Sequence, residues 1–147
     1  MRWDGDYTNC FVGSYGMNRW LGEDLLGSAP TKVFRNESDI AHPEFTPILA
    51  DSVLAWAFPV ASDLPPTDLT DASGVFRFGL GIECFTIPRH GSCPNPVPTD
   101  WPSDKPLPGA VNVSFFDGHG ELVKLDRLWQ LYWHRDYEPP PKRPGLP

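Results

Sequence analysis

The fold is decided by the stretch Val111-Asn-Val-Ser-Phe-Phe-Asp-Gly-His-Gly-Glu-Leu-Val-Lys-Leu125, in which two apolar, alternating segments flank Asp117-Gly118. An Asp-Gly pair supplies the positive φ angles that a tight, right-twisted hairpin turn requires. Alternation of apolar and polar residues is the pattern of a strand with one buried face. We therefore predict a β-hairpin over residues 111–125.

A short helix is predicted to follow the hairpin, because the apolar period changes to that of a helix. Asp126 can cap the first helical turn with its carboxylate. Trp129 and Trp133 are four residues apart, so we expect them to anchor one helical face on the sheet. The apolar residues at helical spacing are Leu128, Trp129, Leu131 and Tyr132.

Three upstream segments carry weaker patterns. Residues 47–59 are bounded by prolines and favour one or two buried strands. Residues 75–87 alternate unevenly and contain glycines, which predicts a strand with a bulge or a closely apposed backbone. Residues 17–26 lie in a glycine-rich, aromatic region and are expected to include a short helical piece.

The proline and glycine content predicts a loop-rich domain. There are 18 Pro and 13 Gly in 147 residues, which exceeds the average share and requires many turns and loops. The loops are placed at residues 62–73 and 92–108, and residues 139–147 are expected to form an extended, polyproline-like tail. A single domain over residues 1–138 is expected. Its fold class is α+β: an antiparallel sheet with a C-terminal β-hairpin, short helices and long loops.

The charge balance argues against two classes of partner. A formal net charge of -7 disfavours contact with phosphate backbones, and no Lys/Arg cluster reaches the density that nucleic-acid or anionic-membrane binding needs. No apolar stretch approaches the roughly 20 residues of a membrane span, and the N-terminus lacks the apolar core of a signal peptide. We expect a soluble chain that contacts neither nucleic acid nor a membrane.

The three cysteines form an odd set. Only Cys84 and Cys93 are close enough in sequence for a short-loop disulfide, which would stabilise the fold by roughly 2–3 kcal/mol. The alternative is that they are buried thiols. Cys10 has no nearby partner in the sequence, and no pair has the spacing of a zinc knuckle.

Several segments together resemble one bacterial family, the prepilin-type processing-associated proteins. These are pseudopilin-like chains named for a histidine, nine residues and then Asp-Gly. In this chain the separation between His90 and Asp117 is longer, and the surplus is a Pro-rich insertion. The matching segments are residues 13–21, 46–52, 89–91, 110–119 and 128–137, and the residues of the motif are Arg89, His90, Asp117, Gly118 and His119.

The resemblance implies a fold, a location and a role. The fold would be a pilin-like globular domain without the apolar N-terminal spine helix, and the chain would start beyond that helix. The role would be that of a non-enzymatic subunit of a bacterial surface or type II secretion-like filament, in the periplasm or at the cell surface. Its partners would be other pilin-like subunits. Major pseudopilins hold calcium in a C-terminal loop, so the resemblance also points to that ion.

Two metal-site hypotheses follow from the polar residues. His90 and His119 could meet near the hairpin turn with Asp51 and Asp117, which would suit a transition metal. An oxygen-rich site for calcium would instead use Asp100, Asp104 and Asp117. The alternative is structural: Asp117 serves the turn, and His90 fixes the long loop through backbone hydrogen bonds. Arg89 is then expected to form an ion pair with Asp51 or Asp117.

An enzymatic or sugar-binding role is the other class of hypothesis. Exposed aromatic side chains beside carboxylates are what a sugar-binding cleft requires, and the scattered Trp3, Trp20, Trp56 and Trp101 could supply them. A glycoside hydrolase would use two carboxylates as acid and nucleophile or base. A polysaccharide-binding module would need the same cleft without turnover. The candidate carboxylates are Asp51, Glu83, Asp100, Asp117 and Glu121.

Overall fold

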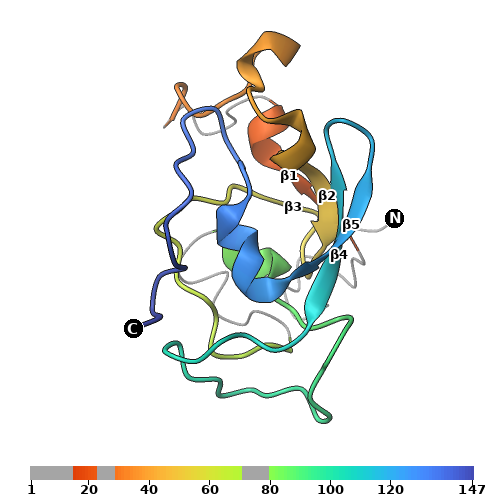
Figure 1. Ribbon diagram of the computed structural model, residues 1–147, viewed down its shortest axis with the longest axis vertical. Coiled ribbons are helices and arrows are strands. Elements are labelled where there is room, and N and C mark those ends of the chain that lie inside the picture. Colours follow the sequence, from red (N-terminus) through yellow and green to blue (C-terminus); the bar gives the residue numbers. More distant parts are fainter. Residues whose placement is uncertain (1–14, 23–28, 71–79) are drawn as a thin grey trace, which may run out of the picture.

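The computed structural model describes residues 15–22, 29–70 and 80–147 of the chain (Figure 1). Its centre is a five-stranded sheet of order β3-β1-β2-β4-β5. The fold is therefore α+β and loop-rich, as predicted. The strands are β1 (Tyr15–Asn18), β2 (Pro47–Asp51), β3 (Trp56–Ala57), β4 (Ala110–Phe115) and β5 (Gly120–Lys124).

The predicted β-hairpin is confirmed as β4 and β5, which pair from Ala110↔Lys124 to Ser114↔Gly120. The two strands predicted in residues 47–59 are β2 and β3. One pairing differs from the expected antiparallel sheet, because β3 runs parallel to β1. The chain reverses after Asp51 and crosses β1 to reach its far edge, so the sheet is mixed.

The hairpin turn is wider than predicted. The Phe115 carbonyl accepts from the Gly118 N–H at 3.0 Å, and the Phe115 N–H donates to the His119 carbonyl at 2.9 Å. Gly118 has a φ of 94°, which a side chain disfavours. This is a three-residue loop in which the last residue takes the positive φ. Asp117 supports it by accepting from the His119 N–H at 3.1 Å.

The described helices are all short 3₁₀ segments. The helix predicted after the hairpin is η5 (Leu125–Gln130), but Asp126 does not cap it, because its carboxylate accepts from the Leu107 N–H instead. The strand predicted over residues 75–87 is wrong where the structure describes it, since η4 (Ile82–Phe85) lies there. The short helical piece predicted at residues 17–26 is η1 (Arg19–Leu21), which follows the end of β1; residues 23–28 lie outside the described part. The remaining segments are η2 (Glu37–Asp39) and η3 (Pro43–Phe45).

The core lies on one side of the sheet, where η4 and η5 cover it (Figure 1). Trp129 and Trp133 are fully buried there, which confirms that they anchor the C-terminal segment. The ring of Phe85 stacks on Trp133 with centroids 4.9 Å apart. Asn18 is also buried, and its amide donates to the carbonyls of Pro47 at 3.0 Å and Trp133 at 2.8 Å. This amide joins the first strand to the last part of the core.

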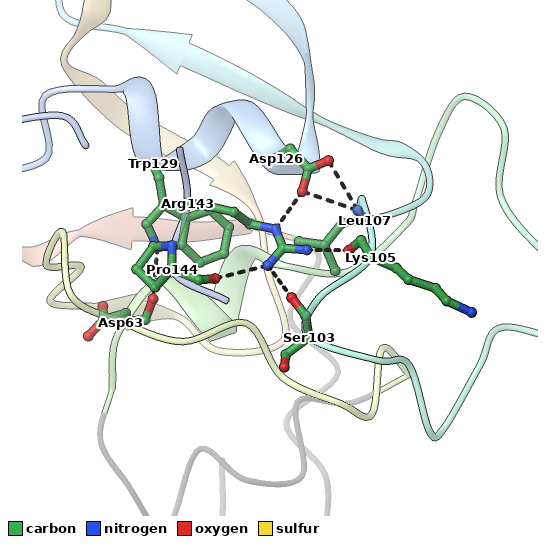
Figure 2. Close-up of polar contacts among 8 residues, drawn as sticks. All are labelled: Asp63, Ser103, Lys105, Leu107, Asp126, Trp129, Arg143 and Pro144. Carbon is green, nitrogen blue, oxygen red and sulfur yellow. Dashed lines mark hydrogen bonds and ion pairs between the residues drawn. The ribbon is translucent and has the colours of Figure 1, made fainter. Parts of the chain in front are cut away.

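The C-terminal tail packs on the domain rather than extending into solvent. The Arg143 side chain is 0% exposed and its Nε lies 2.5 Å from Asp126 Oδ1. Its Nη1 donates to the Ser103 carbonyl at 2.8 Å, and its Nη2 donates to the Lys105 carbonyl (Figure 2). The guanidinium thus ties the tail to η5 and to the Pro-rich loop. The predicted extended conformation is interrupted by a bend at residues 141–142 and by a turn in which Gly145 has a φ of 93°.

The predicted disulfide is absent, because Cys84 and Cys93 are both free thiols. Cys84 is buried in η4, whereas the Cys93 thiol lies on the loop and donates to the His90 carbonyl at 2.9 Å. Cys10 lies outside the described residues. No helix in the described ranges has the length and apolar character needed to cross a bilayer.

Candidate functional site

The second side of the sheet carries an apolar surface that the rest of the described chain leaves exposed. Side chains alternate across a strand, so the residues between the buried positions of β1 and β2 point away from the core. Met17 is paired with Leu49 on one neighbour and with Trp56 on the other, which places the three side by side. We call this surface the outer face; its large apolar members are Tyr15, Met17, Leu49, Trp56 and Leu122.

A groove of about 480 Å³ runs across the outer face. Tyr15 and Leu49 line it from β1 and β2, and Leu122 lines it from β5. Its polar lining residues are Asn112 and Ser114 of β4 and Glu121 of β5. The groove therefore combines apolar walls with a few polar atoms, as small-molecule and peptide sites do.

A polar cluster of Asp51, His90 and Asn112 lies at one end of this groove. His90 reaches it because residue 90 forms a β-bridge with Ala110 at the start of β4. The His90 Nε2 lies 3.1 Å from Asp51 Oδ2 and 2.9 Å from Asn112 Nδ2. The same Asp51 oxygen accepts from the Asn112 N–H at 2.6 Å. A nearly buried carboxylate thus holds a half-exposed imidazole beside the groove.

The chemistry of this cluster is limited by its neighbours. A carboxylate that orients an imidazole is one half of a catalytic triad, and the other half is a hydroxyl or thiol hydrogen-bonded to the ring. No such group donates to the His90 ring among the residues that the structure describes. Ser52, the nearest in sequence to Asp51, donates its hydroxyl to the Cys84 carbonyl at 3.0 Å. The cluster can orient a ligand, but it lacks an activated nucleophile.

The two histidines of the predicted metal site do not meet. His119 lies at the hairpin turn, where its Nδ1 is 2.6 Å from Asp117 Oδ1 and its ring stacks on Phe115. The hydrogen bond from His119 lowers the pKa of Asp117. His90 is bridged to Ala110 at the opposite end of β4, so the strand separates the two sites. The hypothesis of a shared transition-metal site is wrong for this reason.

The predicted calcium ligands are also not gathered. Asp100 and Asp104 are exposed on the Pro-rich loop, while Asp117 belongs to the hairpin turn. Within the described ranges, no three of the His, Cys, Asp and Glu side chains are grouped so that they could hold a metal ion. The structural alternative fits better: Asp117 supports the turn, and the His90 backbone pairs with Ala110 at 2.9 and 2.8 Å.

Glu83 is influenced by a second acidic side chain, that of Asp63. Burial raises the pKa of both groups, and the charge of Asp63 raises the pKa of Glu83 further. Asp63 Oδ2 accepts from the N–H groups of Val60 at 2.8 Å and Ile82 at 2.9 Å. Glu83 accepts from the Gly81 N–H at 3.0 Å. These bonds hold the chain around η4, so the pair has a structural role; Asp63 carried no signal in the sequence beyond its loop composition.

The other predicted site residues are dispersed. Glu121 forms an exposed ion pair with Arg127 at 2.6 Å. Arg89 forms neither predicted ion pair, since its Nη2 approaches the Ser52 carbonyl at 3.5 Å. Trp20 is buried in the core, and Trp56 is exposed on the outer face. Of the five carboxylates proposed for glycoside hydrolysis, Glu121 lines the groove on the outer face, and no tryptophan lines that groove; Trp3 lies outside the described residues.

Comparison of the chain with family models, curated proteins and solved structures gave no match. Function must therefore be argued from the surface itself. The outer face, with its groove and the Asp51–His90–Asn112 cluster, is the feature that the packing of the described domain does not explain.

Proposed function

We propose that this chain is a non-enzymatic, pseudopilin-like subunit of a bacterial surface or type II secretion-like filament, and that it assembles through the outer face. The observation that carries the proposal is the apolar surface formed by exposed side chains of β1, β2 and β3, with Leu122 of β5 beyond the polar Asn112 and Ser114 of β4. Monomeric soluble proteins rarely expose large contiguous apolar patches. In a filament, neighbouring subunits would cover such a surface and keep it away from water.

The composition of the outer face supports a protein partner. Protein interfaces are enriched in Tyr, Trp and Met and are depleted of charge at their centre. Tyr15, Met17 and Trp56 have these characters, and the large side chains around them are apolar. The charged groups of the outer face, Asp51 and Lys124, lie toward one end of the strands.

The geometry of the outer face suits an apolar helix. A helix is roughly 10 Å across, and neighbouring strands are roughly 4.8 Å apart, so one helix covers about two to three strands. Sheets bury an apolar face in this way when a helix packs on them. In the proposed filament the outer face would pack on the apolar helical core, and the Pro-rich loop would face outward in the periplasm or at the cell surface.

A polysaccharide-binding module is the second candidate function. It is favoured by the groove of about 480 Å³, whose lining includes both Tyr15 and Asn112. Aromatic rings and planar amides are both common contacts for sugars. A glycoside hydrolase is less well supported. Glu121 lines this groove and Asp51 lies at its end, but Glu121 is paired with Arg127 at 2.6 Å and Asp51 with His90 at 3.1 Å.

The two candidates are separated by a charge substitution on the outer face. In the filament subunit, Leu122→Glu should abolish the concentration-dependent association of the purified chain measured by sedimentation equilibrium. The matched control is Leu64→Glu, which places the same charge at an exposed leucine on a loop outside the outer face. Equal effects of both variants, or a wild-type chain that stays monomeric at all concentrations, would contradict assembly through this surface. Saturable binding of a polysaccharide, lost in the Asn112→Ala variant, would support the second candidate.

A further inference from the structure

The strand β5 is the long open edge of the sheet (Figure 1). The opposite edge strand, β3, has two residues, whereas β5 has five. Natural proteins guard such edges with prolines, bulges or very short strands, because unpaired N–H and C=O groups bind other strands. β5 contains no proline, and its register with β4 is continuous. Its remaining guards are the charges of Glu121 and Lys124.

The β4–β5 ladder determines which backbone groups point to this edge. In an antiparallel pair, residues that bond to the residue opposite alternate with residues that point away from it. The Phe115 N–H donates to the His119 carbonyl at 2.9 Å, which fixes this alternation along the register of the two strands. The backbone groups of Gly120, Leu122 and Lys124 therefore point away from β4. We call these three the edge residues.

The hydrogen bonds on the far side of β4 confirm this orientation. Ala110 and Asn112 lie opposite edge residues in the ladder, so their N–H groups also point away from it. The Ala110 N–H donates to the His90 carbonyl at 2.8 Å. The Asn112 N–H donates to the Asp51 carboxylate at 2.6 Å. The N–H groups of the edge residues have no such acceptor within the part of the chain that the structure describes.

We propose that β5 pairs with the β5 of a second copy of this chain, antiparallel and centred on Leu122. Each Leu122 N–H then donates to the Leu122 carbonyl of the other copy. Each Lys124 N–H donates to the Gly120 carbonyl of the other copy, so the open groups of both strands are satisfied together. The two sheets become one continuous sheet, as in other cases of strand addition.

The side chains of β5 favour this register over its neighbours. If the pairing were centred on Glu121, the two carboxylates would face each other, and like charges directly opposite are destabilising. If it were centred on Val123, Gly120 would lose its partner. Centred on Leu122, the strands place two half-exposed leucines together. Glu121 then faces Val123, and Lys124 faces a glycine, which has no side chain to clash with it.

A second copy fits this edge because one contact closes two open edges, whereas an unrelated peptide would close one. The contact differs from the proposed filament contact, since it uses the backbone of β5 instead of the apolar side chains of β1, β2 and β3. Two paired strands form a small interface, at the low end of the size range, below about 1,200 Å². The pairing should therefore form in a concentrated sample and dissociate on dilution.

Residue-resolved amide hydrogen exchange, measured by NMR in a dilute and a concentrated sample, tests the pairing. The N–H groups of the edge residues should gain protection in the concentrated sample. Those of Glu121 and Val123 bond to β4 and should be equally protected in both samples. Association through side chains of the outer face cannot produce this alternation along one strand. In a mixture of isotope-labelled and unlabelled chains, contact between Hα of Glu121 in one copy and Hα of Val123 in the other identifies the register.

Three variants separate the backbone contact from the side chains. Leu122→Pro removes the central N–H of the edge but no bond of the β4–β5 ladder, and proline is tolerated at such positions. Each copy then loses one donor, so association should weaken roughly 30-fold. Leu122→Ala is the matched control, because it keeps the N–H and should weaken association less. Met17→Glu places a charge on the outer face away from β5 and should leave the alternating protection unchanged.

The exchange pattern of the wild type decides the proposal even if Leu122→Pro folds poorly. Concentration-dependent, alternating protection that persists in Met17→Glu supports pairing of two copies. Equal exchange of the edge residues at both concentrations would overturn it: rapid exchange would show that the edge stays open, and protection already present on dilution would show that another segment of the same chain covers it. Equal association of Leu122→Pro and Leu122→Ala would also overturn it. Association that Met17→Glu abolishes, without alternating protection in the wild type, would support the outer face alone and exclude the edge contact.

Discussion

Replacing Arg143 by methionine should detach the C-terminal tail and destabilise the whole domain. The guanidinium is fully buried and bonds to the Asp126 carboxylate at 2.5 Å. It also donates to the carbonyls of Ser103, Lys105 and Pro144 (Figure 2), and it lies 6.0 Å from the centre of the Trp129 ring. Methionine keeps much of the apolar stem but removes all of these hydrogen bonds.

The magnitude follows from what the substitution leaves behind. Removing one partner of a buried ion pair costs about 3–5 kcal/mol, because the other charge stays in the protein without compensation. Asp126 is 30% exposed and keeps its bond from the Leu107 N–H, so part of this penalty is relieved by water. The carbonyls of Ser103 and Lys105 lose their donor as well. We therefore expect a loss of about 3 kcal/mol, or a decrease in Tm of roughly 6–12 °C.

Urea unfolding followed by tryptophan fluorescence measures this loss, and Arg127→Met is the matched control. Arg127 forms an ion pair with Glu121 at 2.6 Å, but both side chains are well exposed. Such pairs contribute at most about 1 kcal/mol. Hydrogen exchange should show the loss of protection in Arg143→Met around residues 103–107.

The reasoning would be refuted if Arg143→Met and Arg127→Met unfolded at the same urea concentration. It would also be refuted if Arg143→Met lost stability while residues 103–107 kept their protection. Arg143→Lys refines the result, because a lysine keeps the charge but lacks the planar fork of donors. Its stability should lie between those of the wild type and Arg143→Met.

Three further predictions concern the turn, the acidic pair and the thiols. Gly118→Val should lower the free energy of unfolding by about 1–3 kcal/mol in thermal unfolding, because residue 118 has a φ of 94°. Gly120→Val should lower it less, because residue 120 is not at positive φ. Equal losses in the two variants would contradict the turn assignment. Because the pKa of Asp63 is raised in the folded state, the contribution of this residue to stability decreases as the pH rises above 3.8. The free energy of unfolding of Asp63→Asn relative to that of the wild type should therefore increase from pH 4 to pH 7. A difference that stays constant with pH would exclude this. Burial raises the pKa of the Cys84 thiol, whereas Cys93 is partly exposed. At pH 8 a thiol reagent should therefore modify Cys93 much faster than Cys84, as measured by peptide mass mapping. Denaturant should remove this difference in rate.

The elements predicted correctly from the sequence are those specified by local patterns. The β4–β5 hairpin needs only alternation and a glycine at its turn, and both are visible in residues 111–125. The burial of Trp129 and Trp133 follows from their size and spacing. β1 was missed because it depends on distant partners: Gly16 allows the close approach of the Leu54 carbonyl, and a Cβ there would lie 2.4 Å from it. No local pattern reports such a contact.

The candidate site was only partly accessible to sequence reasoning. Asp51 and His90 were both identified as candidates, and the structure places them 3.1 Å apart. Their association with Asn112, and the separation of His90 from His119, depend on the register of β4, which the sequence does not fix. The role of Arg143 was hidden for a similar reason. A basic residue among prolines is usually solvated. The acceptors of Arg143 include Asp126 of η5 and two carbonyls of the Pro-rich loop, which are brought to it only by the tertiary fold.

The buried amide of Asn18 has a consequence for how the protein is made. It bonds to the Trp133 carbonyl, 115 positions later in the chain. Contacts between such distant residues form late, because a long loop must close first. A ribosome that has completed the first four strands has therefore not yet delivered the residues that cover their core side. The nascent chain carries an open sheet until the segment around Trp133 emerges, so we expect this domain to fold only after that segment has left the ribosome. Premature termination before Trp133 should leave a chain that aggregates.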